Sequence, residues 1–409
     1  MAIIMAQSVA DNGNSKIIKS HTKKTNSIGK EAFFVTGSID IPFLAITIAL
    51  LTIGLIMLFS SSYPNAYYYK DHDSYYFFTR QFIFAVIGIV AMFVMSKVNY
   101  KWLKVVNIPL LCITLILLVL VLFVHTNVGG ADGSDFKRWI PLPGGFTFQP
   151  SDLAKFSIIL AFAGYISNYY SKMRTFKYGI VYPLCIIAVF CGLIVLEHHM
   201  SCTILMFLIG ATLMFAGGSD WKLFAFGLGV LILVIFVVIT FPEMLENYAG
   251  DRIRAWLDKD FDPAGARWQT NNSLYAIGSG GFFGVGLGNS KQKYLYVSEP
   301  QNDFIFSIVC EELGFIGAAV IILLFAALVI RGFVIASRCQ DKFGSLLVIG
   351  IVAQIGIQVG LNIMVVTDTI PNTGIALPFF SYGGTALLML LFEIGVVLAV
   401  SRKSSQKKV

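Results

Sequence analysis

Residues 291–314 read KQKYLYVSEPQNDFIFSIVCEELG, and within them a polar loop turns directly into an apolar segment. Asp303 lies at this turn and is followed at once by Phe304, Ile305 and Phe306. A carboxylate at the mouth of a membrane helix costs free energy because water solvates it incompletely, so such a residue is a functional candidate. An Asp in a first helical turn can equally be a cap, because its carboxylate accepts from free backbone N–H groups. Both interpretations stay open on this stretch alone.

The apolar segment is one of about ten runs that are long enough, at ~20 residues, to cross a hydrocarbon layer about 30 Å thick. Of the 409 residues, 56% are hydrophobic and only 13% are charged, which leaves too little polar surface for a soluble domain. We therefore expect an all-α polytopic membrane protein with about ten transmembrane helices and one large extracytoplasmic loop. The predicted spans are 41–62, 77–96, 104–125, 151–170, 180–197, 201–217, 222–241, 303–330, 343–366 and 382–401.

The basic residues predict which segments lie inside the cell. Most of the 30 Lys and Arg residues fall in segments that a cytoplasmic N-terminus would place inside, so the positive-inside rule puts both termini in the cytoplasm. The net charge of +7 therefore follows membrane topology and does not indicate nucleic acid. The expected organisation is a basic, disordered cytoplasmic tail (1–40), a single transmembrane domain (41–401) with a large outer loop (242–302), and a cytoplasmic C-terminal tail (402–409).

Polar residues concentrate in three segments that this topology places outside: 126–150, 242–302 and 367–381. A structureless loop as long as 242–302 is uncommon in a compact protein unless it has a function. One part of it, DRIRAWLDKDFDP, mixes apolar and charged residues as an interfacial amphipathic helix does. Its glycine-rich part, SGGFFGVGLGNS (279–290), could present backbone N–H groups to a phosphate or form a tightly packed loop. Because no predicted strand precedes it, a nucleotide-binding fold is excluded.

Two charged groups lie next to the fourth predicted span. Lys137, Arg138 and Trp139 precede it and combine two cations with an aromatic ring, which suits either membrane-surface anchoring or a substrate contact. Asp152 and Lys155 lie three residues apart within it and so share a helix face. A charged pair that enters a membrane helix must face protein or water, so these two form either a structural ion pair or a substrate contact.

The remaining acidic residues of the spans are read more simply as structural. Glu311 and Glu312 follow Asp303 by eight and nine residues, so on a regular helix they cannot both face the same cavity as Asp303. At least one of them is expected to be paired within the bundle. Glu393, alone in the last span, is also expected to pair there.

The cysteines indicate neither a zinc site nor a disulfide framework. The six cysteines fall in apolar runs or at their ends, and none forms a CxxC pair. Glu197, His198 and His199 could be a proton site or metal ligands, but consecutive side chains diverge around a helix. A polar hinge between two short spans is therefore the favoured interpretation of this segment.

Several motifs together resemble one known family. LPFFSYGGTALL (377–388) resembles the signature of the SEDS proteins, the shape, elongation, division and sporulation family that includes FtsW and RodA. The resemblance extends to RWIPLPGGFTFQPSDLAK (138–155), to the segment 273–317 and to the plan of ten spans. The wording PNTGIALPFFSYGG and the long basic tail are more similar to the division branch (FtsW) than to the elongation branch (RodA). In one departure, the segment 197–202 reads EHHMSC where many relatives carry a QPDLGT-like segment, so no site role is carried onto it.

This resemblance implies an activity and a location. The family is known as integral-membrane peptidoglycan glycosyltransferases, which polymerise lipid II on the outer face of the bacterial cytoplasmic membrane. The implied partners are lipid II (a disaccharide-peptide on undecaprenyl pyrophosphate), a class B penicillin-binding protein as transpeptidase, other divisome proteins and membrane lipids. The FtsW-like wording implies work at the division septum.

The resemblance also implies a set of site residues. Asp303 stands at the position of the family's essential carboxylate, in the DFIF motif, which favours chemistry over capping. Its implied role is that of a general base on the 4-hydroxyl of the acceptor GlcNAc, which attacks the anomeric carbon of the donor MurNAc. Lys155, Arg138 and either Lys291 or Lys293 would lie against the pyrophosphate. The further residues implied in substrate binding are Lys137, Trp139, Asp152 and Ser381.

Two alternatives from other classes stay open, as does the question of a metal. The donor bond supplies the energy, so no nucleotide cofactor is expected, and a divalent cation (Mg or Mn) at Asp303 is an option. A lipid II flippase or transporter would also have many spans and buried charges, although its site is expected near the midplane with inverted repeats. A non-catalytic divisome scaffold is the third interpretation.

Overall fold

The computed structural model describes residues 33–125, 128–129, 135–143, 146–222, 248–265 and 267–405, together with a few single positions between 223 and 247. The first 32 residues of the predicted N-terminal tail, the last four residues of the chain and most of the predicted span 222–241 lie outside the described residues.

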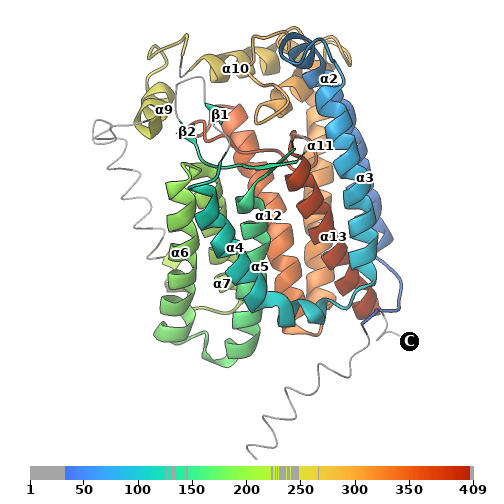
Figure 1. Ribbon diagram of the computed structural model, residues 1–409, viewed down its shortest axis with the longest axis vertical. Coiled ribbons are helices and arrows are strands. Elements are labelled where there is room, and N and C mark those ends of the chain that lie inside the picture. Colours follow the sequence, from blue (N-terminus) through green and yellow to red (C-terminus); the bar gives the residue numbers. More distant parts are fainter. Residues whose placement is uncertain are drawn as a thin grey trace, which may run out of the picture.

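The long helices run side by side as a bundle (Figure 1). Seven helices in the described part are long and apolar enough to cross a membrane, and the prediction of an all-α polytopic membrane protein is confirmed. Most predicted spans agree with a helix to within a few residues. These helices are α2 (Ile41–Tyr69), α3 (Tyr76–Lys97), α4 (Leu103–Val121), α5 (Pro150–Tyr169), α6 (Tyr182–Leu196), α7 (Met200–Ala216), α11 (Ile305–Arg338), α12 (Lys342–Val366) and α13 (Gly384–Ser405). Short 3-10 turns (Tyr100–Trp102, Tyr170–Lys172) and a π-helical turn (Lys177–Val181) precede or follow them.

The loops gather at one end of the bundle, which we call the loop end (Figure 1). It carries α9 (Tyr248–Leu257), α10 (Trp268–Gly280) and two antiparallel two-stranded sheets. The sheets pair β1 (Val128–Gly129) with β2 (Asp135–Phe136), and β3 (Ile140–Leu142) with β4 (Phe146–Phe148). The helix α9 forms where the sequence predicted an amphipathic helix, whereas α10 and the strands were not predicted.

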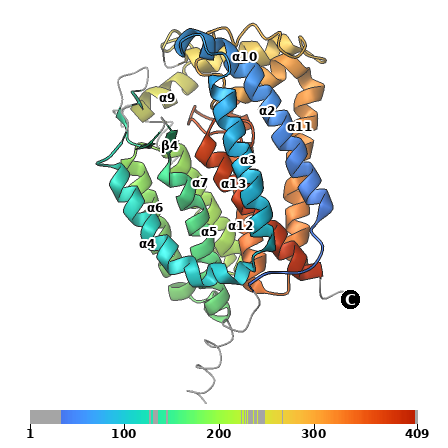
Figure 2. The same cartoon turned by 45° about the vertical axis from the view of Figure 1, so that its right-hand side comes forward.

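The helix α5 lies in the middle of the bundle, where it packs against α4, α7, α12 and α13 (Figure 2). Most of its residues are buried, so it has no apolar stripe on one side. A helix that is apolar on all faces is expected in the interior of a bundle rather than at its surface. The helix α3 packs along α13 on another side of the molecule.

The turn between α6 and α7 forms the predicted polar hinge. The helix α6 ends at Leu196, α7 begins at Met200, and His198 between them has a left-handed backbone with φ 56°. Such a conformation disfavours a continuous helix, so the two short spans are separate.

The helix α11 is broken at Gly314, where φ is 68° and ψ is −170°. Its 34 residues would measure about 51 Å if straight, well beyond a hydrocarbon layer of about 30 Å. The glycine-rich segment 280–286 fills the break, and a Cβ at Gly284 would approach the carbonyl oxygen of Glu312 to 2.2 Å. Four backbone N–H groups donate across the break: Phe315 to Gly281, Ile316 to Phe282, Val285 to Glu311 and Gly286 to Glu312. Within the glycine-rich segment, the backbone N–H groups of Gly284, Val285 and Gly286 already donate to protein carbonyls, so the structure supports the packed-loop interpretation of this part.

Candidate active site at the loop end

Asp303 lies in the turn that leads into α11, and its backbone is fixed from several sides. The side chain of Asn362 in α12 donates to the carbonyl oxygens of Asp303 and Ile375, each at 2.7 Å. Ser381 donates through Oγ to the carbonyl of Asn302 at 2.8 Å. The signature segment and the turn before α11 are thus held together at this point.

The Asp303 side chain does not cap the helix. The N-cap residue of α11 is Phe304, and no side-chain cap hydrogen bond is made there. In the part of the chain that the structure describes, no ion pair or hydrogen bond holds the Asp303 carboxylate. Gly374 gives it room, because a Cβ at that position would lie 3.0 Å from Oδ2 of Asp303. The capping interpretation therefore loses its support, and the carboxylate is available for chemistry.

The electrostatics of Asp303 suit a base. The carboxyl is half-buried, and burial raises its pKa to about 6, while the positive charges of Arg138 and Arg252 oppose the rise. Glu299 raises the pKa further. At neutral pH the group is mostly ionised and still more basic than an ordinary aspartate, which is the range in which a carboxylate works as a general base.

The positive charges of two arginines act on Asp303 from different segments of the loop end. Arg138, in the connection between β2 and β3, donates through Nη2 to the carbonyl oxygen of His198. Burial lowers the pKa of Arg138 to about 10, so it still carries its charge at neutral pH. Arg252 of α9 donates to the carbonyl oxygen of Asn372 at 2.9 Å. Sequence reasoning missed Arg252, and the only signal for it was its place in the amphipathic segment DRIRAW.

Lys137 and Trp139 flank Arg138 in the same connection, and both are partly buried. The structure therefore keeps the three predicted residues 137–139 beside one another at the loop end, with Arg138 as the member whose charge acts on Asp303.

Asp152 and Lys155 form the ion pair that their spacing predicted, at 2.9 Å. They line a cavity of about 40 Å³ together with Gln354, Glu393 and part of the signature segment. Glu393 accepts from the side chain of Gln354 at 2.9 Å, so the prediction that it pairs within the bundle is confirmed. Asp303 does not line this cavity, which has room for about three water molecules. The pair thus faces a separate, small polar space within the bundle.

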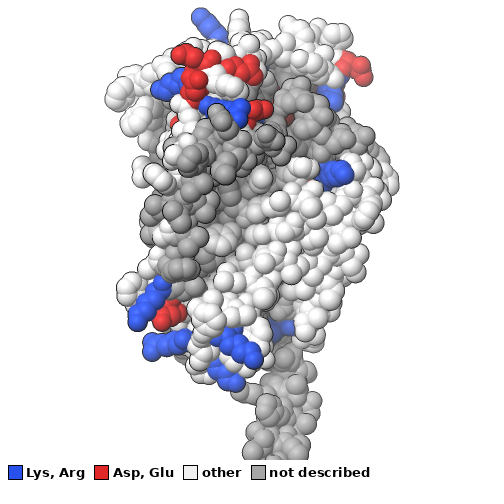
Figure 3. All heavy atoms as spheres, turned by 90° about the vertical axis from the view of Figure 1, so that its left-hand side faces the viewer, with Lys and Arg blue, Asp and Glu red and all other residues white. Residues whose placement is uncertain are grey.

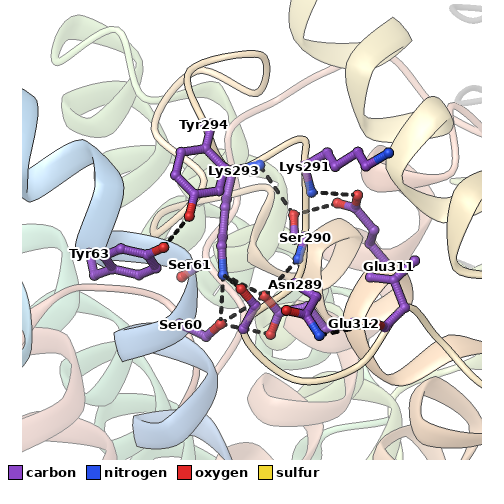
Figure 4. A network of polar contacts seen from close by, with 12 residues as sticks. Ser60, Ser61, Tyr63, Asn289, Ser290, Lys291, Lys293, Tyr294, Glu311 and Glu312 are labelled. Carbon is purple, nitrogen blue, oxygen red and sulfur yellow. Dashed lines mark hydrogen bonds and ion pairs between the residues drawn. The ribbon is translucent and has the colours of Figure 1, made fainter.

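Lys293 lies elsewhere, in a buried network that ties the loop before α11 to the helices α2 and α11 (Figure 4). Its Nζ is 2.8 Å from Oε1 of Glu312, and both side chains are 0% exposed. Ser60 of α2 donates to the same carboxylate and lies 3.2 Å from Nζ of Lys293. The expected contact of Lys293 with pyrophosphate is revised accordingly, because a fully buried, paired ammonium does not face a substrate.

Glu311 completes the network from the neighbouring position (Figure 4). It accepts from the hydroxyl of Ser290 and from the backbone N–H of Lys291, the latter at 2.9 Å. The prediction that at least one of Glu311 and Glu312 is paired is confirmed for both. The side chain of Lys291 is exposed and points away from the network, so its proposed substrate contact stays a prediction.

Ser381 is buried, and its hydroxyl is fully engaged. It accepts from the backbone N–H of Leu377 at 2.7 Å and donates to the carbonyl of Asn302. This geometry favours a role in positioning the turn that carries Asp303.

Fold and site together define a class: polytopic helical membrane proteins with a carboxylate and arginines at the loop end of the bundle. A family model described as "Cell cycle protein", which covers FtsW, RodA and SpoVE, matches residues 42–406. The chain belongs to this family, the SEDS proteins, and is FtsW-like.

Individual relatives agree with this assignment. The chain is 41% identical to "Stage V sporulation protein E" of Bacillus subtilis, over 89% of this chain and 97% of that protein. It is 38% identical to the "Probable peptidoglycan glycosyltransferase FtsW" of Trichlorobacter lovleyi, over 88% and 93% of the two chains.

Solved structures share the fold. A chain from "Structural coordination of polymerization and crosslinking by a peptidoglycan synthase complex" superposes with a TM-score of 0.73 and 25% identity, over 90% of this chain and 99% of that one. The rod shape determining protein RodA of Thermus thermophilus gives a TM-score of 0.63 at 24% identity, over 90% and 97%.

Proposed function

We propose that the chain is a peptidoglycan glycosyltransferase that polymerises lipid II on the outer face of the bacterial cytoplasmic membrane, during septal wall synthesis. Asp303 is the general base, and undecaprenyl pyrophosphate leaves with inversion at the anomeric carbon. The observation that carries the proposal is the Asp303 carboxylate, half-buried beside two arginines and held by no ion pair in the described part of the chain. The names of the FtsW relatives support the substrate class.

The proposed step balances with one base. Asp303 takes the proton of the acceptor 4-hydroxyl while that oxygen bonds to the anomeric carbon of the donor. The bond from this carbon to the pyrophosphate oxygen breaks, and its electron pair stays on the pyrophosphate. Because lipid pyrophosphate is already a good leaving group, a second carboxylic acid is not obligatory, unlike in ordinary glycoside hydrolysis.

Arg138 and Arg252 would stabilise the negative charge of the departing pyrophosphate. A guanidinium presents paired N–H donors that match phosphate oxygens, so it suits this role better than an ammonium does. Lys137, next to Arg138 and partly exposed, stays a further candidate. Lys155 would reach a substrate only if its cavity opened, since about 40 Å³ admits nothing larger than a few waters.

A divalent cation such as Mg²⁺ or Mn²⁺ fits this site only in part. The described residues contain no group of three or more His, Cys, Asp or Glu that could hold a metal ion. Mg²⁺ is often bound by one carboxylate together with substrate phosphates, so Asp303 would be its protein ligand. When bound there, the cation would supply charge stabilisation to the leaving group.

The proposed orientation places the loop end outside and both termini inside. Figure 3 shows that the charged residues at the end opposite the loop end are mainly Lys and Arg, whereas the loop end carries acidic and basic residues together. The positive-inside rule supports this orientation. A class B penicillin-binding protein is the proposed partner, and the fold shared with a chain of a peptidoglycan synthase complex supports it.

Asp303→Asn tests the proposal, because it keeps the size of the side chain and removes its basic oxygen. We expect polymerisation of labelled lipid II by the purified protein with its partner, in detergent, to fall by about 100-fold or more. Thermal stability and partner binding should persist, which controls for folding. Near-normal polymerisation by this variant would exclude Asp303 as the general base.

A lipid II transporter is the second candidate, favoured by the charged cavity between α5, α12 and α13. The same assay separates the two functions, because detergent abolishes transport across a bilayer. Polymer formed there supports an enzyme, and its absence from an intact complex favours a transporter or a scaffold.

A further inference from the structure

Glu197, in the hinge between α6 and α7, is a buried carboxyl that the proposed mechanism leaves unused. Its side chain is 0% exposed, and neither carboxylate oxygen has a hydrogen-bond partner in the described part of the chain. An ionised carboxylate is strongly disfavoured in such a place, because it has lost its hydration and gained no hydrogen-bond donor in exchange. The geometry therefore favours the neutral, protonated acid.

The charged group next to Glu197 is Arg138. The guanidinium of Arg138 donates to the carbonyl oxygen of His198, the residue that follows Glu197 in the hinge. Its positive charge acts on Glu197 and on Asp303, so one arginine serves two carboxyls. The protonation state of Glu197 thus decides how much of this charge is left for Asp303 and for a bound anion.

The other titratable groups around Glu197 carry no charge that would replace Arg138. His199, in the same hinge, has a pKa well below its ordinary value because of burial and the nearby charges of Arg138 and Lys155, so it is neutral at pH 7. Cys202 of α7 is a buried thiol. Burial raises the pKa of Glu197 to about 8, against the opposing effect of Arg138.

We propose that Glu197 is a positioning residue that holds a proton in the working enzyme and thereby leaves the charge of Arg138 to Asp303 and the pyrophosphate. When Glu197 loses this proton, its carboxylate attracts Arg138 and glycosyl transfer slows. The inference rests on the proposed function and adds a second titrating group to it. The reaction requires this group and Asp303 to be in opposite protonation states. Asp303 must be ionised, and Glu197 must be neutral.

The test is the pH dependence of polymerisation by Glu197→Gln, which keeps the shape of the neutral acid and cannot ionise. With labelled lipid II and the partner protein in detergent, the wild type should lose kcat/KM by about tenfold per pH unit above about 8. Glu197→Gln should keep the acid limb near pH 6 and lack this alkaline fall. A merely structural role would lower activity equally at every pH.

Glu393→Gln is the matched control, because Glu393 is also a buried carboxyl with one unpartnered oxygen and lies beside Lys155 rather than Arg138. It should keep the alkaline fall. An unchanged alkaline fall in Glu197→Gln would overturn the inference.

Infrared spectroscopy separates failure of this inference from failure of the proposed function, because it needs no activity. The difference between the spectra of the wild type and Glu197→Gln should contain a protonated carboxylic acid band at pH 7 that is lost above about pH 8, because a band from Glu393 is common to both proteins and cancels. A wild type that makes no polymer but shows this band would refute the glycosyltransferase proposal and keep the proton at Glu197. Absence of this band would refute the claim that Glu197 is protonated at pH 7.

Discussion

At the residue scale, the site depends on one carboxyl whose environment raises its pKa while two arginines limit the rise. Burial alone would make Asp303 a still weaker acid, and the guanidiniums of Arg138 and Arg252 favour its ionised form. The arginines thus have two effects in the proposed reaction: they keep the base ionised at neutral pH, and they face the leaving group.

Removal of one arginine separates these effects. In the wild type, the rate of polymerisation should fall on the acid side near pH 6. We expect this fall to move to higher pH in Arg252→Gln. The sign follows because the loss of a positive neighbour raises the pKa of Asp303, so a smaller fraction is ionised at a given pH. The loss of rate near pH 6 should exceed the loss near pH 8 by about threefold or more.

The matched control is Arg254→Gln, on the same helix α9, whose charge is not among those that shift Asp303. It should leave the acid limb in place. An Arg252→Gln profile that falls equally at every pH would mean that Arg252 acts on the substrate alone.

At the element scale, the buried network around Glu311 and Glu312 attaches the loop before α11 to the helices. The Lys293–Glu312 pair joins the loop to α11, and Ser60 adds α2. Burying an ion pair is costly, so its net contribution to stability is small, but removal of one partner leaves the other buried and uncompensated.

We therefore expect Lys293→Met to lower the free energy of unfolding by about 3–5 kcal/mol, measured by thermal or denaturant unfolding in detergent. The double variant Lys293→Met with Glu312→Gln removes both charges and should recover most of this loss. It should also polymerise lipid II, since neither side chain faces the proposed site. If Lys293→Met were as stable as the wild type, the Lys293–Glu312 pair would not be what holds the loop to the helices.

The predicted elements and the observed ones differ for physical reasons. Long apolar runs predict helices well because burial in lipid allows few other structures, and Asp303 stood out as a charge at the end of such a run. The strands of 128–148 are only two or three residues long, which is too short for an alternation of apolar and polar residues to be recognised. The break at Gly314 was hidden because a glycine within an apolar run does not by itself end a helix.

Long-range contacts explain the misjudged site residues. Lys293 looked like a solvent-exposed loop cation, and its partners Glu312 and Ser60 are distant in sequence. Arg252 donates to the carbonyl oxygen of Asn372, which is 120 residues away in the sequence. No local pattern reports such contacts, whereas the Asp152–Lys155 pair, three residues apart, was predictable from helix geometry.

At the scale of the whole molecule, the proposed orientation can be tested with cysteine labelling. In a variant without the six native cysteines, Ser298→Cys places an exposed thiol at the loop end and Ser171→Cys places one in the turn after α5. A membrane-impermeant maleimide added to intact spheroplasts should label the first and not the second. Both should react after permeabilisation, which controls for accessibility. The reverse pattern would contradict an outer active site.

The break in α11 also sets how deep the chemistry lies. From Phe315 onward about 24 residues remain, or ~36 Å of helix, which by itself suffices to traverse the hydrocarbon. In the proposed orientation, the first turns of α11, which are hydrogen-bonded to the glycine-rich segment, would lie in the headgroup layer. Asp303 would therefore lie at the depth at which the pyrophosphate of a lipid-linked sugar is located in the membrane. The substrate could then react without being extracted from the bilayer.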